Sequence, residues 1–436
     1  MRNFVSQLPQ RRHKQKASTN EETEQAVALT LPSWIENYLQ WHREMRVKFP
    51  NETLFTDPNA PKLLIRTCTV KCGGLHDRLG KIPWDVYLAN RTNRVLLYHW
   101  CKPANLENYL QPNKVDWTVP AILSEYFVSE NTVCSKTVDR QVPDLFHGLG
   151  NAKRPSEEFW TTTVSEAIER AKNGSFADKR ILREEILGID QRLDERLPLQ
   201  DRGIFAFGKP YFGALFHTFF QPVPRLQQKI DSAMAKLKLV KNQFAAVHCR
   251  VRHPKATSSY NDLESKEGTP GGPDRSGLKW EGKSKLYAIE IATGAMKCIQ
   301  KLVKSEPVYF LADSEDLVRF MSHDVKAPGY EAPTEVELQA LNISRQIQIV
   351  SRNDGAANLH LDRQGGSERD PTEFDPTFVD LLIASQARCI GLGIGSYALF
   401  AGKLSGTTCI QQYAKESWGK SDIDILKEKT SQQCEL

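Results

Sequence analysis

Several features that would assign a function directly are missing from this sequence of 436 residues. Its most apolar stretch, residues 378–402, is interrupted by Asp380 and Arg388, so neither piece is long enough to span a bilayer. The nine cysteines include Cys68 and Cys72, four positions apart, but no second Cys or His pair completes a zinc motif. No Asp-x-Asp triplet stands at the end of a predicted strand, so the sequence predicts no metal site.

A chain-wide excess of positive charge is also missing. The sequence has 58 Lys and Arg against 53 Asp and Glu, a net charge of +5, and five of the basic residues lie within the acid-free residues 1–16. The remainder is therefore neutral, which argues against a broad basic surface for nucleic acid. With 40% hydrophobic and 25% charged residues, the composition is that of a folded globular protein of about two or three domains.

Two stretches of the sequence alternate between strand and helix patterns. In the first, 62–70 predicts a strand, residues from Leu75 predict a helix that Pro83 kinks or shortens, and 94–100 predicts a second, parallel strand. In the second, strands are predicted at 243–249, 307–312, 347–350, 388–392 and 408–412, and helices at 227–241, 284–304, 315–322, 377–386 and 396–404. The second pattern is typical of a doubly wound α/β domain, which binds ligands at the carboxyl ends of its strands.

The expected domain organisation follows from these patterns. Residues 1–30 predict a disordered basic arm, 31–225 an N-terminal Rossmann-like domain, 226–425 a C-terminal Rossmann-like domain, and 426–436 a tail. The middle of the chain is less regular, with helical pieces over 156–190 and an aromatic stretch at 211–220. Two α/β halves joined near residue 225 predict a ligand cleft between them.

The first candidate site follows the strand at 243–249. Because side chains alternate along a strand, Ala246, His248 and Arg250 are expected to share one face. Arg250 then emerges at the carboxyl end, where its guanidinium can grip a phosphate, with Arg252 one step further out. The alternative is a strand-end arginine paired with a surface carboxylate.

The second candidate site is the segment Arg388–Tyr397, a strand that runs through Gly391, Gly393 and Gly395 into a helix beginning at Ser396. Backbone N–H groups at a helix N-terminus bind phosphate, although this spacing is neither the Rossmann nor the Walker pattern. A tight structural turn is the alternative. Asp380, on the preceding helix, is expected either to accept hydrogen bonds from a ribose, a sugar hydroxyl or a guanine edge, or to cap and pair with Arg388.

The third candidate site is the turn after the first strand, Gly73-Gly74-Leu75-His76-Asp77-Arg78. Two glycines let the chain turn sharply and approach a partner, and Asp77 and Arg78 are expected to face the cleft. The alternative is an ordinary strand–helix turn with a local Asp–Arg pair.

These motifs together resemble the GDP-fucose-dependent fucosyltransferase superfamily. The segment AAVHCRVRHP resembles the H-x-R motif that follows a hydrophobic strand, and FVDLLIASQARCIGLGIGSY resembles the later D-x4-S-Q-A motif with a Ser at a helix start. VYFLADSED is similar to the strand that ends in an acidic pair, and CGGLHDRLGKI to the G-G-L-G-D-R loop of the plant-like branch. The chain departs from these patterns at Val251, which precedes Arg252, and at His76, where the loop has glycine.

The resemblance implies a GT-B fold, two Rossmann-like domains facing a cleft, and an inverting transfer of fucose from GDP-fucose that requires no metal or other cofactor. It implies that Arg250 steadies the leaving β-phosphate and that His248 contacts the donor. The remaining implied roles are as follows: nucleotide and phosphate contacts for Asp380, Gly395, Ser396 and Tyr397, a place beside the guanosine for Asp313 or Ser314, donor contact for Arg252, and the N-terminal wall of the cleft for Gly73, Gly74, Asp77 and Arg78. Asp77 and His76 are the two candidates for the general base.

The acceptor implied by the resemblance is a glycan or protein hydroxyl, and no nucleic-acid partner is expected. The family implies the secretory pathway, Golgi or ER, and membrane association is expected only if the chain's start is incomplete. A catalytically silent GT-B protein that binds glycans or GDP-sugars is the alternative. A nicotinamide-dependent oxidoreductase is disfavoured because no Gly-x-Gly-x-x-Gly follows the first strand of either half.

Overall fold

The computed structural model describes residues 31–68, 73–100, 103–120, 168–169, 172–174, 177–185, 211–250, 282–303, 305–322, 348–352, 354, 361, 370–393, 396–413 and 432–433. The expected arm at 1–30 and the tail at 426–436 therefore lie largely or wholly outside the described residues. Arg252 and Gly395, two of the predicted site residues, lie outside them too.

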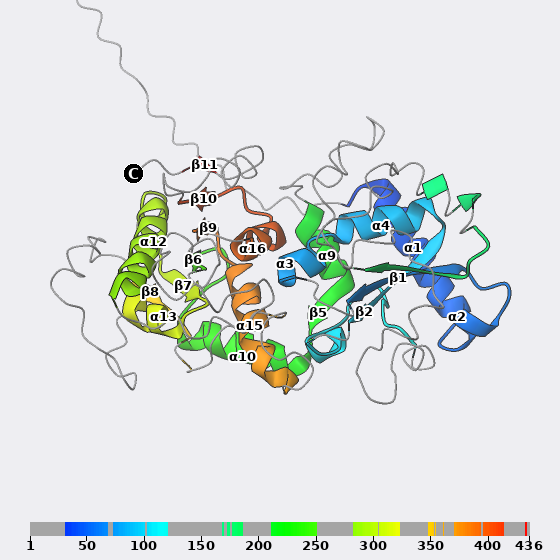
Figure 1. Ribbon diagram of the computed structural model, residues 1–436, viewed down its shortest axis with the longest axis horizontal. Helices are drawn as coiled ribbons and strands as arrows, with labels where there is room; N and C mark the ends of the chain where they lie inside the picture. The colour runs from blue at the N-terminus through cyan, green and yellow to red at the C-terminus, as the bar shows by residue number, and fades with distance from the viewer. Residues whose placement is uncertain are drawn as a thin grey trace, which may run out of the picture.

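A six-stranded parallel sheet organises the C-terminal half, in the order β11-β10-β9-β6-β7-β8 (Figure 1). The strands are β6 (Ala245–Cys249), β7 (Val308–Ala312), β8 (Ile349–Val350), β9 (Cys389–Leu392), β10 (Ile410–Gln412) and β11 (Gln432–Gln433). The chain fills the sheet from β6 outward to β8 and then returns to the other side of β6 with β9. This is the doubly wound order, so the topological switch point lies between β6 and β9.

Helices cover both faces of this sheet, as the predicted alternation requires. Ala245, Val247 and Cys249 of β6 pack in a cluster with α12 (Gly282–Gln300) and α13 (Glu315–Ser322). Ala246 belongs to the cluster on the opposite face, which includes α10 (Pro224–Lys236), α15 (Asp375–Ala384) and α16 (Tyr397–Ser405). The two-residue period of β6 is thus confirmed. The predicted helices and strands of this half all form, α13 with its predicted bounds and the others with shifted ends.

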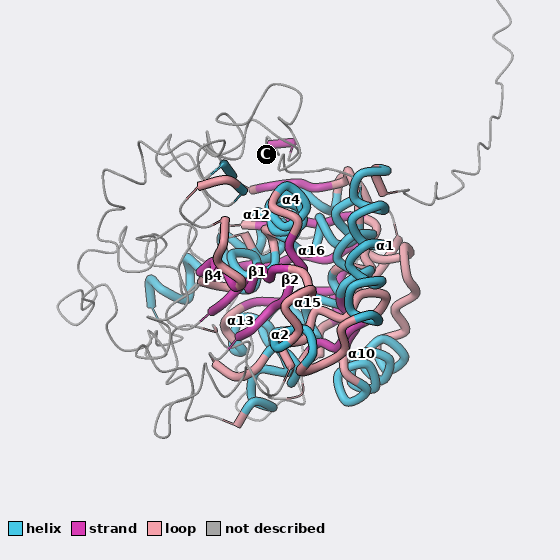
Figure 2. The backbone as a smooth tube through the Cα atoms, turned by 90° about the vertical axis from the view of Figure 1, so that its right-hand side faces the viewer, coloured by secondary structure: helices cyan, strands magenta, loops and turns pink. Residues whose placement is uncertain are grey.

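A three-stranded parallel sheet in the order β2-β1-β4 organises the N-terminal half (Figure 2). Its strands are β1 (Lys62–Cys68), β2 (Arg94–Trp100) and β4 (Ile181–Glu185). The predicted parallel βαβ unit is confirmed, but its helix is two helices, α3 (Leu75–Leu79) and α4 (Ile82–Arg91), because Pro83 lies in the first turn of α4. The helical prediction over 156–190 is wrong at β4, whose backbone completes the edge of the sheet beside β1.

The remaining elements lie around these two sheets. They are α1 (Ser33–Lys48), α2 (Thr53–Thr56), a 3-10 turn η1 (Leu106–Asn108), β3 (Leu110–Pro112), α9 (Tyr211–Phe219), β5 (Phe220–Pro222) and a second 3-10 turn η7 (Pro371–Phe374). Strands β3 and β5 pair antiparallel, and α1 and α4 lie side by side near the smaller sheet.

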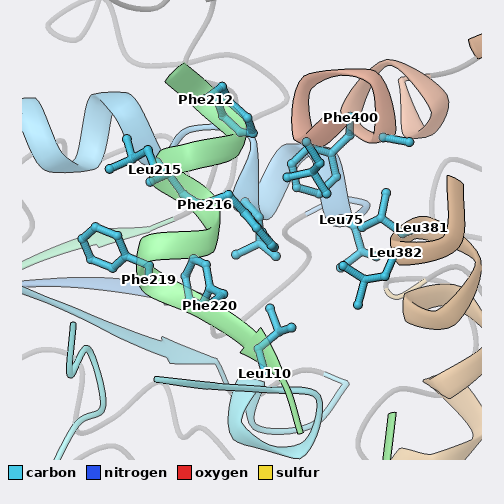
Figure 3. Close-up of a cluster of buried hydrophobic side chains, with 14 of the residues drawn as sticks. Leu75, Leu110, Phe212, Leu215, Phe216, Phe219, Phe220, Leu381, Leu382 and Phe400 are labelled. Carbon is cyan, nitrogen blue, oxygen red and sulfur yellow. The ribbon is translucent and has the colours of Figure 1, made fainter. Parts of the chain in front are cut away.

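The two halves meet at α3, α9, α15 and α16, in the middle of the molecule (Figure 1). Phe212 and Phe216 of α9 point toward Phe400 of α16 (Figure 3), with each pair of ring centroids 6.0 Å apart. Helices α9 and α16 approach so closely that a Cβ on Gly213 would lie 2.2 Å from the carbonyl oxygen of Leu404. One buried cluster therefore runs through both halves, and their division into two domains at residue 225 stays a prediction.

Two further features of the chain bear on its environment. Cys389 of β9 and Cys409, just before β10, form a disulfide, whereas Cys249 is a buried free thiol. Within the described residues, no helix combines the length and apolar character needed to cross a membrane.

Candidate functional site

His248 and Arg250 lie at the carboxyl end of β6, as predicted. The His248 side chain is buried, its ring centroid lies 4.9 Å from that of Tyr397, and its Nδ1 has no hydrogen-bond partner among the described residues. Burial lowers the pKa of His248 to about 3, and the nearby charge of Arg250 adds to this effect while Asp380 opposes it. The imidazole is therefore neutral at pH 7 and offers a ligand an unmet hydrogen bond.

Ser396 and Tyr397 lie directly across the switch point, where the chain leaves β9 and enters α16. Ser396 is the N-cap residue of α16, but its hydroxyl makes no capping hydrogen bond. The Tyr397 hydroxyl donates to the carbonyl oxygen of Thr377, 2.5 Å away, which ties the start of α16 to α15. The N-terminus of a helix and the neutral His248 imidazole thus meet at the carboxyl edge of the two central strands.

Gly391 of β9 and Gly393, which directly follows β9, have a structural role. A Cβ on Gly391 would lie 2.3 Å from Cγ1 of Ile299, and one on Gly393 would lie 2.8 Å from Cγ2 of Ile291. Both isoleucines belong to α12, so these glycines let that helix pack closely on the sheet. Packing against α12 is therefore enough to explain why both residues are glycine, without the expected approach of a phosphate.

Asp313 and Ser314 follow β7, the strand beside β6. The Ser314 hydroxyl lies 3.5 Å from the backbone N–H of Leu317, a long contact at the start of α13. Ser314 is buried and Asp313 is partly exposed, so the two residues stand at the same edge of the sheet as Arg250. The sequence placed both correctly at a strand end.

Asp380 lies on α15 and contacts the sheet through Tyr309, with its side chain 6% exposed. It accepts a hydrogen bond of 2.6 Å from the hydroxyl of Tyr309 on β7 and a charged hydrogen bond from Nε of Arg352. The predicted alternative, a pair with Arg388, is wrong, because Arg388 forms a forked ion pair with Glu306. Arg388 precedes β9, so it stands at the amino edge of the sheet, away from Asp380.

Arg352 is the residue of this site that the motifs did not indicate. It follows β8 by two positions, so it emerges at the carboxyl edge beside β7. Its guanidinium joins Asp380 to Asp354 through Nε and Nη1. Its signal in the sequence was an arginine just after a short predicted strand, the same signal that singled out Arg250.

A second unused signal lies before α12. Residues 277–284 read Gly-Leu-Lys-Trp-Glu-Gly-Lys-Ser, which fits the Gly-x4-Gly-Lys-Ser pattern of phosphate-binding loops. Its last three residues begin α12, the helix that follows β6. Residues 277–281 and the side chains of 282–284 lie outside the described part of the chain, so the pattern remains an observation on the sequence.

The Gly73–Arg78 turn is held by its own side chains. Gly73 has a φ of +79°, and Asp77 fills the space beside it and accepts a 2.8 Å hydrogen bond from the N–H of Gly74. Arg78 is fully buried, stacks its guanidinium 5.0 Å from the Trp100 ring centroid, and donates to the carbonyl oxygen of Gly73. The prediction that Arg78 faces an open gap is therefore wrong, whereas Asp77 is 53% exposed.

His76 of the same turn reaches the C-terminal half. Its Nε2 lies 3.2 Å from Nζ of Lys403 on α16, and its ring lies edge-on to Phe400 with centroids 5.9 Å apart. Burial, with the charge of Lys403, lowers the pKa of His76 to about 4. Partial burial raises the pKa of Asp77, but the contact with His76 and the N–H of Gly74 outweigh it, so that carboxylate is ionised at pH 7.

A pocket of about 660 Å³ adjoins this site. It lies between α10, the start of α15 and the end of β8, and its walls carry both signs of charge. The lining side chains are Gln228, Lys229, Ser232, Ala233, Lys236, Leu237, Arg352, Asp354, Thr372, Glu373, Asp375, Pro376 and Val379. In the described ranges, no three His, Cys, Asp or Glu side chains are grouped to hold a metal ion.

Of the predicted C-terminal residues that the structure describes, three therefore stand at one edge of one sheet, and the N-terminal turn lies against α16. Arg250, Asp313 and Ser396 follow β6, β7 and β9 respectively. No family model matches the chain, and no curated protein matches it.

The chain is similar to solved structures at low identity. An Arabidopsis thaliana FUT1 mutant in complex with GDP has a TM-score of 0.48 and 12% identity, covering 91% of this chain and 82% of that chain. The fucosyltransferase NodZ from Bradyrhizobium has a TM-score of 0.35 and 12% identity, covering 78% and 91%. NodZ α-1,6-fucosyltransferase soaked with GDP-fucose has a TM-score of 0.36 and 11% identity, covering 79% and 92%. At these identities no residue role is carried over from those proteins to this chain.

Proposed function

We propose that this chain is a glycosyltransferase that moves fucose from GDP-fucose to a hydroxyl of a glycan or protein, with inversion and without a metal ion. The observation that carries the proposal is the position of the H-x-R and Ser-Tyr motifs. They lie at the carboxyl ends of β6 and β9, on the two sides of the switch point at which doubly wound folds bind nucleotides. The resemblance of those motifs to the fucosyltransferase family is our reason for proposing GDP-fucose as the donor.

The chemistry of transfer suits these residues. As the bond between fucose C1 and the β-phosphate oxygen breaks, the leaving GDP gains negative charge. In this proposal Arg250 and the N–H groups at the start of α16 stabilise that charge, which is our reason for proposing a metal-independent reaction. The neutral His248 imidazole adds a hydrogen bond without adding a charge.

The acceptor side is proposed to be the Gly73–Arg78 turn. The acceptor hydroxyl attacks C1 from the face opposite GDP, forms the new glycosidic bond, and releases its proton. Asp77 is ionised and half-exposed, so it can take that proton, although one of its oxygens already accepts from Gly74. His76 is a weaker candidate because it is buried against Lys403 and its pKa is about 4.

The test compares arginines at opposite edges of one sheet. Arg250→Ala is expected to lower the turnover of GDP-fucose about 100-fold or more while leaving the unfolding temperature unchanged. Arg388→Ala, at the amino edge, is the matched control and is expected to keep full turnover. Unchanged turnover in Arg250→Ala contradicts the proposal.

Binding measurements separate this proposal from the alternatives. Calorimetry with GDP, GDP-fucose, UDP and NAD is run on the wild-type protein beside assays of transfer and donor hydrolysis. GDP binding without turnover favours a catalytically silent protein, and binding of NAD but not GDP favours an oxidoreductase.

We also propose the secretory pathway, Golgi or ER, as the compartment. The Cys389–Cys409 disulfide supports this, because such bonds persist in oxidising compartments. Mass mapping of the unreduced protein purified from secretory-pathway membranes tests the assignment, and free thiols at both positions would count against it.

A further inference from the structure

Asp380 is already occupied by groups of the protein itself. Its carboxylate accepts from the Tyr309 hydroxyl at 2.6 Å and from Arg352, and its side chain is 6% exposed. A carboxylate that bound a nucleotide directly would have to give up these bonds or present another edge to solvent. Its arrangement is that of a group that holds Arg352 in place.

Arg352 reaches a cavity, as does its partner Asp354. It lies at the end of β8 and lines the pocket of about 660 Å³ between α10 and α15. Its guanidinium carries five N–H donors in a fixed plane, and the two carboxylates Asp380 and Asp354 fix the direction of that plane. Tyr309 fixes Asp380 in turn.

The position of Arg352 matches the length of a nucleoside diphosphate. Strands β6 and β8 are separated by β7, so their ends lie about 10 Å apart at the usual strand spacing. If a diphosphate lies at the end of β6 and the start of α16 and the nucleoside extends toward β7, the nucleoside reaches the ends of β7 and β8. Lys229 and Lys236 of α10 stand on the other wall of the same pocket.

We propose that Arg352 binds the nucleoside end of the donor and that Asp380 and Tyr309 are positioning residues that aim its guanidinium. This inference rests on the proposed function and reassigns Asp380 from direct contact to an indirect role. Arginine presents donors alone, so it suits the O6 and N7 acceptors of guanine, whereas adenine carries an amino group at the position of O6. Arg352 is thereby a determinant of base preference.

The experiment measures nucleotide binding by calorimetry in Arg352→Lys, Asp380→Asn, Tyr309→Phe and the double variant Arg352→Lys/Asp380→Asn. Arg388→Lys is the matched control, because it makes the same change at a forked arginine–carboxylate pair outside the site. The nucleotides are GDP and ADP, and the unfolding temperature of each variant is recorded without nucleotide.

We expect Arg352→Lys to weaken GDP binding about tenfold or more and to narrow the preference for GDP over ADP. Asp380→Asn should reproduce both effects, and the double variant should lose no more than either single variant, because the two residues act as one unit. Tyr309→Phe should show a smaller loss in the same direction. If Asp380→Asn does not fold, the cycle is run with Tyr309→Phe instead.

The outcomes separate this inference from the proposed function. GDP binding and base preference that persist in Arg352→Lys overturn the inference alone, and so do losses that add in the double variant. If wild-type protein binds another nucleotide instead of GDP, the proposed donor is wrong. The role of Arg352 is then tested by measuring the binding of that nucleotide to the same variants. If it binds no nucleotide, both proposals fail.

Discussion

Lys403 of α16 and His76 of α3 join the two halves of the molecule, with Nζ and Nε2 3.2 Å apart. Their surroundings are mainly aromatic, since Lys403 lies over the Phe212 ring and His76 lies edge-on to Phe400. Lys403 lies on the same helix as Ser396 and Tyr397, at the end opposite the proposed phosphate site. The contact therefore links the turn that carries Asp77 to the helix that begins at the donor.

This contact predicts a dependence of stability on pH. Burial, together with the charge of Lys81, lowers the pKa of Lys403 to about 7. Unfolded protein keeps that proton up to about pH 10, so the free energy of unfolding should rise between pH 7 and pH 10, by at most about 1.4 kcal/mol per pH unit. Lys403→Met should remove this slope in urea unfolding, whereas Lys236→Met, on the exposed face of α10, should keep it.

Gly391→Ala should separate packing from ligand binding. The new methyl group would meet Ile299 and Val247, at 2.3 and 3.0 Å in the present geometry, so we expect a loss of about 1–3 kcal/mol in the free energy of unfolding. GDP affinity at a temperature where the variant is folded should stay within twofold of wild type. Ser396→Ala should show the reverse pattern, and a selective loss of GDP binding in Gly391→Ala would contradict the packing role.

Asp375 predicts a large stability effect at the junction of α10 and α15. It is fully buried and accepts from Arg225 at 2.8 and 3.0 Å and from Lys229 at 2.7 Å. Asp375→Ala removes the shared partner of two cations and should cost about 3 kcal/mol in denaturant unfolding. The exposed Asp231→Ala is the comparison, with an expected change within about 0.5 kcal/mol. If both variants lose the same free energy of unfolding, the buried Asp375 contributes no more to stability than a surface carboxylate, which contradicts the prediction.

The Cys389–Cys409 disulfide closes a segment of 20 residues that contains the start of α16. Closing a loop of that length in the unfolded chain should stabilise the fold by about 3 kcal/mol. The double variant Cys389→Ala/Cys409→Ala should therefore unfold at a lower denaturant concentration than the oxidised protein. A reducing agent should lower the midpoint of the wild type and leave that of the double variant unchanged.

Much of the fold could be read from the sequence because its signals are local. The apolar run at 243–249 and the helix-period pattern at 284–304 each reflect the face that a residue buries, and both appear with ends shifted by a few residues. Strand β4 was missed because its charged sequence, ILREE, does not carry the apolar run of a buried strand. It is a strand because β1 offers it a free edge, which is a tertiary condition.

Part of the candidate site could be predicted from the sequence, again because the signals are local. Arg250 could be placed because it directly follows a strand, and Ser396 because it lies four residues after one; a strand's carboxyl end is known from its direction in the chain. The partner of Asp380 could not be found, because Arg352 is 28 residues away and meets it through the packing of α15 on β7 and β8. Arg78 was misplaced because nothing in its neighbours shows that Trp100 covers it.

The absence of long apolar runs and the neutrality of the chain after its first 16 residues were properties of the sequence alone, and they argued against a membrane span and a broad basic surface. The alternating strand and helix patterns, also properties of the sequence, indicated an α/β protein. The order of strands in the sheet decided where the candidate site lies. Placing β6 beside β9 brings together motifs almost 150 residues apart, because parallel strands align their carboxyl ends at one edge. Composition and periodicity depend on neighbours along the chain, whereas a binding site depends on which strands pair, and that is settled by packing across the whole molecule.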